Sequence, residues 1–532
     1  MYKVLVSDNI ADSGIDILEE KVEVNYNTNL KREEFLDIIG EYDGIIVRSM
    51  TILDKEALDK AENLKVIGRA GTGYDNIDVE EATKKGIFVF NTPTGNTISA
   101  VEHTMGLMLA LSRNIPQANN ALHEGIWDRK KYMGTEINGK TLGIIGLGKI
   151  GSRVAQRAQA YGMKVIANDP YLAPEKAEKI NVPLLNFRDV LKKSDYISLH
   201  TPLTDETYHI LSKKEFEIMK DSVKIVNCAR GENLDTQALA EAIQEGKVAG
   251  AAVDVHEKEP FTPEENPLVQ LNEKVIMTCH LGGTTTEAMD NVSITAAKQV
   301  LEVLINNNLP ESPLNIPTID PQELNRLKPY MDITKKLGSF MSQWRGHERI
   351  QEIEIEYGGE ILENQLDPFT LTFIKSILDP ILDHRINLVN AEIIAEERGI
   401  DIKESHIKAP EGLKNIIRAN ISTNTGNYSI AGSYLPIGMR IIEINNYRID
   451  FNLEGEFMVL TYQDQPGVIG KIGSILGRND INIASMQVGR KAEGGEAIML
   501  LQTDSKPSEK TMEELQQTSQ ELNVKELSYI II

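Results

Sequence analysis

Arg230, Glu259 and His280 are the residues whose types suit a reaction at a secondary alcohol. Each follows an apolar, strand-like run, namely VKIVNCAR, VAGAAVDVHEKEP and EKVIMTCH. The unperturbed pKa of histidine, about 6.5, is near working pH, so His280 suits a base that takes the hydroxyl proton. Glu259 could hold the imidazole in one tautomer. Arg230 could bind a carboxylate while touching the reacting oxygen.

Each of these residues also has an ordinary interpretation. A histidine at the end of a strand is often only hydrogen-bonded, and Glu259 beside Pro260 could be a solvated loop residue. Thr201 and Asp254, however, follow two further runs of the same kind. Open α/β sheets bind ligands beyond the carboxyl ends of their strands, so all of these side chains should meet at one edge. Their convergence favours a catalytic site.

The reaction also needs a hydride acceptor, and segment 141–170 predicts where it binds. Its three glycines have G-x-G-x-x-G spacing: Gly146, Gly148 and Gly151. They allow a sharp turn, a close approach to a pyrophosphate and tight packing of a helix expected from about Ser152 to Tyr161. The helix N-terminus attracts phosphate. Asp169 ends the next strand, where a carboxylate can bind a ribose and repel a 2′-phosphate, so this residue favours NAD over NADP. The agreement of the glycines, the flanking strands and the acidic residue favours a nucleotide site over an ordinary glycine turn.

Arginines end two strand-like runs earlier in the chain. Arg48 follows YDGIIV and Arg69 follows NLKVIG, and both should face one crevice. Two such residues in an acidic protein favour an anion site over solvated surface charge. Asn96 begins a long apolar helix whose N-terminus also attracts anions. The cations 129–131 form either a surface charge run or part of a phosphate site that reaches into a neighbouring subunit.

The bulk composition narrows the class of protein. The chain has 532 residues, enough for about three or four domains, and a net charge of −23, which argues against a general nucleic-acid surface. No apolar run is long enough to span a membrane, and MYKVLVSDNI is typical of a strand rather than a secretory signal. Two cysteines make no disulfide framework. We expect a cytoplasmic protein without metal, nucleic-acid or membrane partners.

Alternating strand and helix patterns predict an α/β fold. We expect a Rossmann-type NAD-binding domain inserted in a flavodoxin-like substrate domain, then an intervening α/β domain and a C-terminal ferredoxin-like βαββαβ module. We expect a linker before the intervening domain, because four prolines lie close together there: Pro310, Pro313, Pro317 and Pro321. The expected ranges are 1–95 with 284–314 for substrate, 96–283 for NAD, 318–454 for the intervening domain and 456–532 for the last module.

Four motifs resemble the D-isomer-specific 2-hydroxyacid dehydrogenases, namely LGIIGLGKIG, NCARGE, VDVHEKEP and CHLGG. Within that family the chain most resembles the long-form members that oxidise 3-phospho-D-glycerate and carry a C-terminal ACT domain. WDRKKYMGTEINGKTLGIIGLG and DQPGVIGKIGSILGRNDINIASM carry this closer likeness. The resemblance implies NAD-dependent formation of 3-phosphooxypyruvate for L-serine biosynthesis, with L-serine as effector and a homo-oligomer, expected to be a tetramer. Some relatives also reduce 2-oxoglutarate.

The resemblance assigns residues to roles. It gives catalysis to Arg230, Glu259 and His280. For the cofactor it implies, besides the glycine loop, Thr72, Lys149, Ile150, Asp169, Thr201, Cys228, Ala229, Arg230, Asp254, His280, Gly282 and Gly283. For the substrate it implies Arg48, Ser49, Arg69, Asn96 and Arg129. Contacts to L-serine across a dimer are implied for Tyr462, Asp464 and Asn482.

Three questions stay open. Another D-2-hydroxyacid dehydrogenase, such as a glyoxylate or hydroxypyruvate reductase, is disfavoured by the basic residues and the C-terminal module. An NAD-sensing regulator without activity is disfavoured by the intact catalytic set. Cys228 and Cys279 are either small packing residues at strand ends or thiols whose alkylation blocks the cleft.

Overall fold

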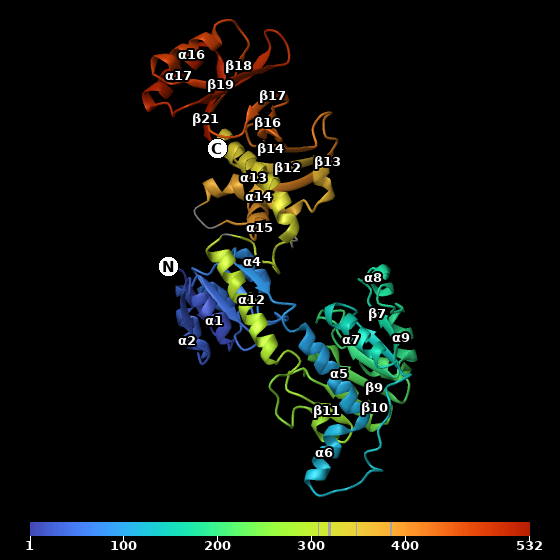
Figure 1. Cartoon of the computed structure of the whole chain (residues 1–532). Coiled ribbons are helices and arrows are strands. Elements are labelled where there is room, and N and C mark those ends of the chain that lie inside the picture. Colours follow the sequence, from blue (N-terminus) through green and yellow to red (C-terminus); the bar gives the residue numbers. More distant parts are fainter. Residues whose placement is uncertain (307, 318–320, 347, 383–385) are drawn as a thin grey trace.

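The computed structural model describes the chain except for residues 307, 318–320, 347 and 383–385. In the described residues, four β-sheets of five, six, six and four strands follow one another along the chain (Figure 1). The second sheet lies to one side of the first, and the third and fourth lie to the other. The start of the expected intervening domain, 318–320, lies outside the described residues.

The first sheet is parallel and has the strand order β2-β1-β3-β4-β5, which is that of flavodoxin-like sheets. Its strands are β1 (Lys3–Val6), β2 (Glu23–Tyr26), β3 (Gly44–Val47), β4 (Val66–Arg69) and β5 (Phe88–Asn91). Its helices are α1 (Asp12–Glu19), α2 (Arg32–Ile38), α3 (Lys55–Lys60) and α4 (Val79–Lys84). Helix α12 (Thr286–Leu304), which comes much later in the chain, packs on this sheet and its helices. Its Ser293 lies against Gly14 of α1, since a Cβ on Gly14 would lie 2.9 Å from Ser293. We call this unit the first lobe.

The second lobe holds six parallel strands in the order β11-β10-β9-β8-β6-β7. They are β6 (Thr141–Ile145), β7 (Lys164–Asn168), β8 (Tyr196–Leu199), β9 (Val223–Asn227), β10 (Val248–Val253) and β11 (Val275–Met277). Its helices are α5 (Thr97–Arg113), α6 (Ile115–His123), α7 (Lys149–Ala160), α8 (Pro174–Glu178), α9 (Phe187–Lys193), α10 (Lys213–Ile218) and α11 (Thr236–Gln244). Because β7 and β8 flank β6, the chain reverses its winding there, which is where such sheets bind ligands.

The third sheet is mixed and the fourth is antiparallel. The third contains β12 (Ile350–Gly359), β13 (Asp401–Ile407), β14 (Asn415–Thr423), β15 (Asn427–Leu435), β16 (Gly438–Ile444) and β17 (Tyr447–Asn452), with α13 (Pro321–Trp344), α14 (Asp367–Leu378) and α15 (Ala391–Glu397). The fourth has the expected βαββαβ order: β18 (Glu456–Gln463), α16 (Val468–Arg478), β19 (Ile483–Arg490), β20 (Glu496–Thr503), α17 (Glu509–Glu521) and β21 (Val524–Ile531). The predicted fold class is therefore confirmed.

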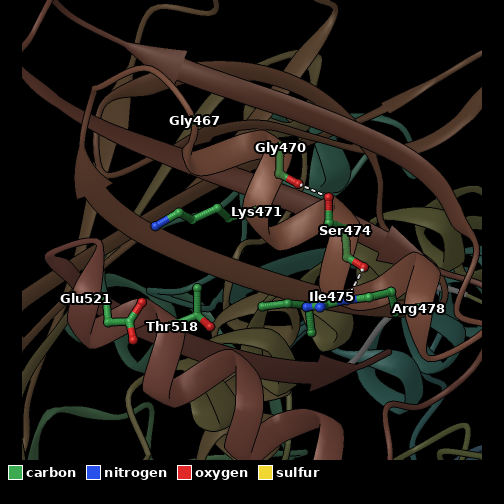
Figure 2. Close-up of a pocket in the computed structure, with 8 residues that line it drawn as sticks. All are labelled: Gly467, Gly470, Lys471, Ser474, Ile475, Arg478, Thr518 and Glu521. Carbon is green, nitrogen blue, oxygen red and sulfur yellow. Dashed lines mark hydrogen bonds between the residues drawn. The ribbon is translucent and has the colours of Figure 1, made fainter.

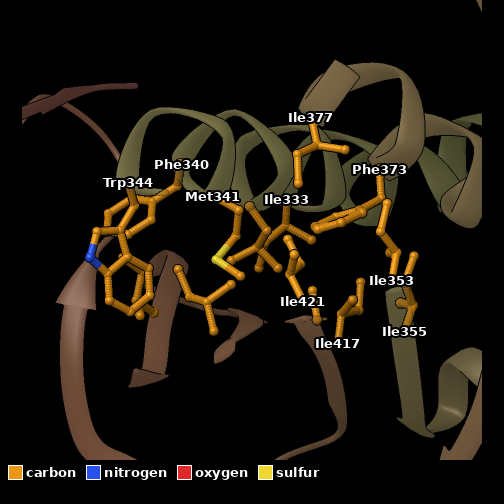
Figure 3. Close-up of a cluster of buried hydrophobic side chains, with 14 of the residues drawn as sticks. Ile333, Phe340, Met341, Trp344, Ile353, Ile355, Phe373, Ile377, Ile417 and Ile421 are labelled. Carbon is orange, nitrogen blue, oxygen red and sulfur yellow. The ribbon is translucent and has the colours of Figure 1, made fainter. Parts of the chain in front are cut away.

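The third and fourth sheets share one hydrophobic core. Phe340 and Trp344 of α13 pack in one cluster with the isoleucines of β12 and β14 and with Phe373 of α14 (Figure 3). The same cluster includes Phe457, Val459, Ile498, Leu500 and Ile530 from one face of the fourth sheet. The other face is covered by α16 and α17. The last two units are thus joined by continuous apolar packing.

One expected helix start and one expected linker residue were wrong. Helix α7 begins at Lys149 rather than near Ser152, because Gly148 has extended backbone angles and is itself the N-cap. Pro321 belongs to α13 rather than to the linker, since proline suits the first helical position, where its missing N–H has no intrahelical acceptor. The helix continues through Pro329.

Candidate active site

The glycine loop between β6 and α7 has the geometry of a phosphate cradle. Gly146 has a φ of +89°, and a Cβ there would lie 2.6 Å from the carbonyl oxygen of His200. A Cβ on Gly151 would lie 2.1 Å from the carbonyl oxygen of Gly146. A Cβ on Gly148, in contrast, would meet nothing within 4 Å. Packing therefore requires glycine at positions 146 and 151, whereas Gly148 leaves open the space that a pyrophosphate needs.

Asp169 lies directly after β7 and fixes the neighbouring backbone. Its Oδ2 atom accepts a hydrogen bond of 2.8 Å from the N–H of Leu147, in the glycine loop. Its Oδ1 atom accepts from the N–H groups of Tyr171 (3.0 Å) and Leu172 (3.1 Å). The carboxylate is thus held beside the loop, where it can still accept from a ribose hydroxyl.

An unpaired hydroxyl supports the fit to a dinucleotide. The Oγ1 atom of Thr201, after β8, is buried and has no hydrogen-bond partner among the described residues. A buried hydroxyl without a partner is costly, so the site is complementary to a polar ligand. A Cβ on Gly146 would lie 3.1 Å from Cγ2 of Thr201, and Lys149 and Ile150 begin α7 directly after the glycine loop. The cradle, the acidic residue and the unpaired hydroxyl together fit NAD.

His280 and Glu259 meet beyond the carboxyl ends of β10 and β11. The Nδ1 atom of His280 lies 2.7 Å from Oε2 of Glu259, while Oε1 accepts from the N–H of His256 at 2.8 Å. Burial alone would raise the pKa of Glu259, but the hydrogen bonds from His280 and His256 outweigh it and lower that pKa. Glu259 is therefore ionised at neutral pH and can only accept, so Nδ1 of His280 carries the proton. The lone pair of the neutral imidazole is then on Nε2.

Asp254 organises the segment that carries His280. Its side chain accepts hydrogen bonds from the N–H groups of Leu281 and Gly282, both at 2.8 Å, and from the hydroxyl of Thr278 at 2.5 Å. Its Oδ1 atom also lies 3.0 Å from Nε2 of His103 in α5. Burial would raise the pKa of Asp254, but these partners outweigh it and lower that pKa well below its usual range. His103 was not predicted as a site residue from the sequence. The sequence indicates only that it is a polar residue within a largely apolar helix.

Arg48 and Arg69 lie at the ends of β3 and β4 in the first lobe. Burial, together with repulsion from Arg48 and Arg230, lowers the pKa of Arg69 to about 10. The Nε atoms of Arg48 and Arg69 are buried without a hydrogen-bond partner among the described residues. Asp8 and Asp75 offset only part of this charge, so the three arginines leave an excess of positive charge, as an anionic substrate requires. Ser49 is exposed beside them.

Asn96 and Thr72 lie where the two lobes meet. The hydroxyl of Thr72 donates to Oδ1 of Asn96 at 2.7 Å. A Cβ on Gly283 would lie 2.8 Å from Nδ2 of Asn96, so the segment after His280 passes close to the start of α5. The structure thus brings together Thr72 and Gly283, which were expected at the cofactor, and Asn96, which was expected at the substrate.

The two cysteines differ in environment. Burial raises the pKa of the Cys228 thiol to about 12. Cys279, directly before His280, is exposed. Cys228 is thus a half-buried residue with a protonated thiol, whereas Cys279 is open to solvent.

Arg129 lies away from the other expected substrate residues. It is exposed near the ring of Trp127, beyond α6. Its neighbour Lys131 pairs at 3.1 Å with Glu273, just before β11, whereas the other candidates lie beyond the carboxyl ends of the strands. Helix α5 has 17 residues and is therefore about 25 Å long, and it runs from the crevice to this opposite edge. Within one chain, Arg129 cannot complete the anion site.

The expected effector residues do not form one cluster in a single chain either. Tyr462 is 1% exposed, inside the core of the fourth sheet. Asp464 follows β18 and pairs with Arg490 at 3.1 Å, while Asn482 donates to Asp504 at 2.7 Å. The strand register places Asp464 and Asn482 near opposite ends of β18. A hollow between α16 and α17 (Figure 2) is lined by none of the three, but by Gly467, Gly470, Lys471, Ser474, Ile475, Arg478, Thr518 and Glu521.

Three family descriptions match successive parts of the chain. Residues 105–282 match the NAD binding domain of the D-isomer specific 2-hydroxyacid dehydrogenases. Residues 326–445 match the D-3-phosphoglycerate dehydrogenase intervening domain, and residues 458–520 match the ACT domain. Among the described residues, no helix is long and apolar enough to cross a bilayer.

Two relatives match over nearly all of both chains. The D-3-phosphoglycerate dehydrogenase of Methanocaldococcus jannaschii is 44% identical over 100% of each chain. That of Bacillus subtilis is 42% identical over 99% of each. Among solved structures, D-lactate dehydrogenase from Aquifex aeolicus, complexed with NAD and lactic acid, is similar with a TM-score of 0.53 and 27% identity. This similarity covers 59% of the present chain and 100% of that chain.

Proposed function

The chain belongs to the D-3-phosphoglycerate dehydrogenases among the D-isomer specific 2-hydroxyacid dehydrogenases, and we propose that it oxidises 3-phospho-D-glycerate to 3-phosphooxypyruvate. It is an NAD-dependent oxidoreductase. The observation that carries the proposed substrate is the excess of positive charge that Arg48, Arg69 and Arg230 leave over the carboxylates of Asp8 and Asp75. The reaction provides the first step of L-serine biosynthesis.

NAD supplies the hydride acceptor when it is bound. The glycine loop and Asp169 hold it, and Thr201 supplies a hydroxyl for which the described residues provide no partner. The remaining expected cofactor contacts, in the segments 228–230 and 280–283, follow β9 and β11. A cofactor held by the loop would therefore lie across the carboxyl ends of these strands, where the proposed catalytic residues are.

His280 is the proposed base. Its Nδ1–H donates to Glu259, so Nε2 is free to take the hydroxyl proton of the substrate. Glu259 fixes the tautomer and stabilises the imidazolium that forms, as the carboxylate does in a hydrolase triad. Arg230 stabilises the oxygen that becomes a carbonyl and binds the adjacent carboxylate.

The arginines of the first lobe are proposed to hold the two anionic ends of the substrate. Arg48 and Arg69, with Ser49 and Asn96, would receive the carboxylate and the phosphate. Reduction of 2-oxoglutarate, another molecule with two anionic groups, is proposed as a side activity of the same site.

A substrate panel tests the proposed function. Turnover with NAD is compared for 3-phospho-D-glycerate and D-glycerate, and reduction is compared for hydroxypyruvate and glyoxylate. We expect kcat/KM for 3-phospho-D-glycerate to exceed that for D-glycerate by at least about 10²-fold, since two charge-assisted contacts to phosphate contribute about 3 kcal/mol or more. Preference for glyoxylate or hydroxypyruvate would instead favour a reductase.

The functional unit is proposed to be a homo-oligomer, specifically a tetramer in the cytoplasm. The second lobe exposes apolar side chains around α6, and such a patch is typical of an interface: Ile115 (54% exposed), Leu122 (55%), Ile126 (47%), Trp127 (73%) and Met133 (75%). A second copy covering this patch would allow Arg129 to act at the partner's site. Trp127→Arg should therefore shift the molar mass measured by light scattering towards the monomer, and an unchanged mass would exclude this patch.

L-serine is the proposed effector at the fourth sheet. Asp464 and Asn482 can meet only across two chains, which agrees with binding at a dimer of this module. The limits 1–95 with 284–314, 96–283, 318–454 and 456–532 remain the proposed domain boundaries.

A further inference from the structure

Arg230 makes an ion pair that joins the two lobes. Its Nε atom donates to Oδ2 of Asp75 at 3.1 Å. Arg230 follows β9 in the second lobe, whereas Asp75 lies in the loop after β4 in the first lobe. The two residues are 155 positions apart in sequence. A carboxylate of the first lobe therefore holds the arginine side chain that is proposed to bind the substrate.

The backbone of the same loop is shaped around this guanidinium. A Cβ on Gly73 would lie 2.3 Å from Nη2 of Arg230, so no larger residue fits there without displacing the arginine. A Cβ on Gly71, which has a φ of +151°, would lie 1.8 Å from Nη1 of Arg69. The loop thus seats two arginines, one from each lobe.

Two donors of Arg230 are already engaged. Besides Nε, its Nη1 atom donates to the carbonyl oxygen of Ala229 at 2.7 Å. A guanidinium has five N–H groups, so the others remain available for a substrate carboxylate. With two bonds made to different segments, the plane of the guanidinium is fixed before the substrate arrives.

We propose that Asp75 is a positioning residue, which holds Arg230 in the orientation needed at the reacting carbon. The proposal rests on the proposed function of Arg230. Because the ion pair joins the two lobes, Arg230 is oriented only when the lobes lie as close as they do here. Asp75 thereby couples closure of the crevice to assembly of the catalytic site.

The competing hypothesis is that Asp75 occupies the place of the substrate carboxylate and must be displaced. The two hypotheses predict opposite results. Loss of a positioning residue lowers kcat, because the misplaced group acts in the transition state. Loss of a competitor lowers KM and leaves kcat unchanged.

The experiment compares Asp75→Ala and Asp75→Asn in the full-length protein. Asp75→Ala should lower kcat about 10²-fold, while KM and the NADH affinity measured by fluorescence change less than about threefold. Asp75→Asn keeps an oxygen that accepts from Nε, so its kcat should recover to within about tenfold of the wild type. The matched control is Glu80→Gln, which removes an exposed carboxylate paired with Lys84 in the same lobe and should leave kcat unchanged.

Several results would overturn the proposal. These are an unchanged kcat in Asp75→Ala, a lowered KM with normal kcat, or equal losses in both Asp75 variants together with weaker NADH binding. Wild-type turnover of 3-phospho-D-glycerate is measured first. Its absence would contradict the proposed function, and the variants would then be compared on whichever hydroxyacid the wild type oxidises.

Discussion

The Nδ1 atom of His280 and the Oε2 atom of Glu259 lie 2.7 Å apart, and this contact determines which imidazole nitrogen can act as a base. The lowered pKa of Glu259 keeps it an acceptor, so the proton is on Nδ1 and the lone pair on Nε2. His280 has a left-handed φ of 56°, and its N–H donates to the carbonyl oxygen of Asp254 at 2.8 Å. Both the side chain and the backbone of His280 are therefore held in place.

The first prediction concerns Glu259. Glu259→Gln should lower kcat about 10²–10⁴-fold, because the amide no longer selects one tautomer or stabilises the imidazolium. NADH affinity should not change. The matched control is Glu264→Gln, an exposed carboxylate in the same loop. A kcat for Glu259→Gln equal to that of the control would remove Glu259 from the mechanism.

The second prediction concerns the phosphate of the substrate. Arg69→Ala should lower kcat/KM for 3-phospho-D-glycerate by at least about tenfold more than for D-glycerate, since a charge-assisted contact to phosphate contributes about 1.5–3 kcal/mol. Arg32→Ala, which removes a surface arginine paired with Asp54 and Glu56 in the same lobe, is the control. Equal losses for both substrates would exclude Arg69 from the phosphate site.

The third prediction concerns thiol labelling. Iodoacetamide reacts with thiolates, and the Cys228 thiol, with a pKa of about 12, stays protonated at pH 8. Mass spectrometry should therefore find the label on Cys279, which is exposed, and not on Cys228. NAD should slow labelling if Cys279 lies at the cofactor site. Labelling of Cys228 at pH 8 would contradict the burial of its thiol, and failure of NAD to protect Cys279 would remove that cysteine from the cleft.

The fourth prediction uses the separation of Asp464 and Asn482. If each L-serine site takes one of these residues from each chain, Asp464→Ala and Asn482→Ala should each abolish binding. A dimer with one chain of each variant then has one intact site and one site that lacks both residues. Mixed samples should regain L-serine binding measured by calorimetry, up to about half of the sites in the mixed dimers. No recovery on mixing would place the effector elsewhere.

The sequence predicts those parts of the site that depend on local pattern. The glycine loop, Asp169 and the residues that follow each strand are set by short-range geometry and by the rule that parallel strands end at one edge. Their positions in the structure agree with the spacing in the sequence. Only the start of α7 differed, because the helix begins directly at the N-cap Gly148.

Contacts between distant segments could not be predicted in this way. His103 reaches Asp254 across 151 residues, and Asp75 reaches Arg230 across 155. No periodicity in the sequence relates these pairs. The resemblance assigned Arg129 to the substrate site, yet α5 takes the chain to the opposite edge of the second sheet, where Arg129 lies. The packing of the last sheet against α13 likewise depends on side chains from two units that the sequence suggested were separate.

The most direct test of the account is turnover by His280→Ala with saturating NAD and 3-phospho-D-glycerate. With Nε2 absent, kcat should fall about 10²–10⁴-fold, while NADH affinity measured by fluorescence stays that of the wild type, because the glycine loop and Asp169 are untouched. Turnover close to that of the wild type at saturation would contradict the role of His280 as the base.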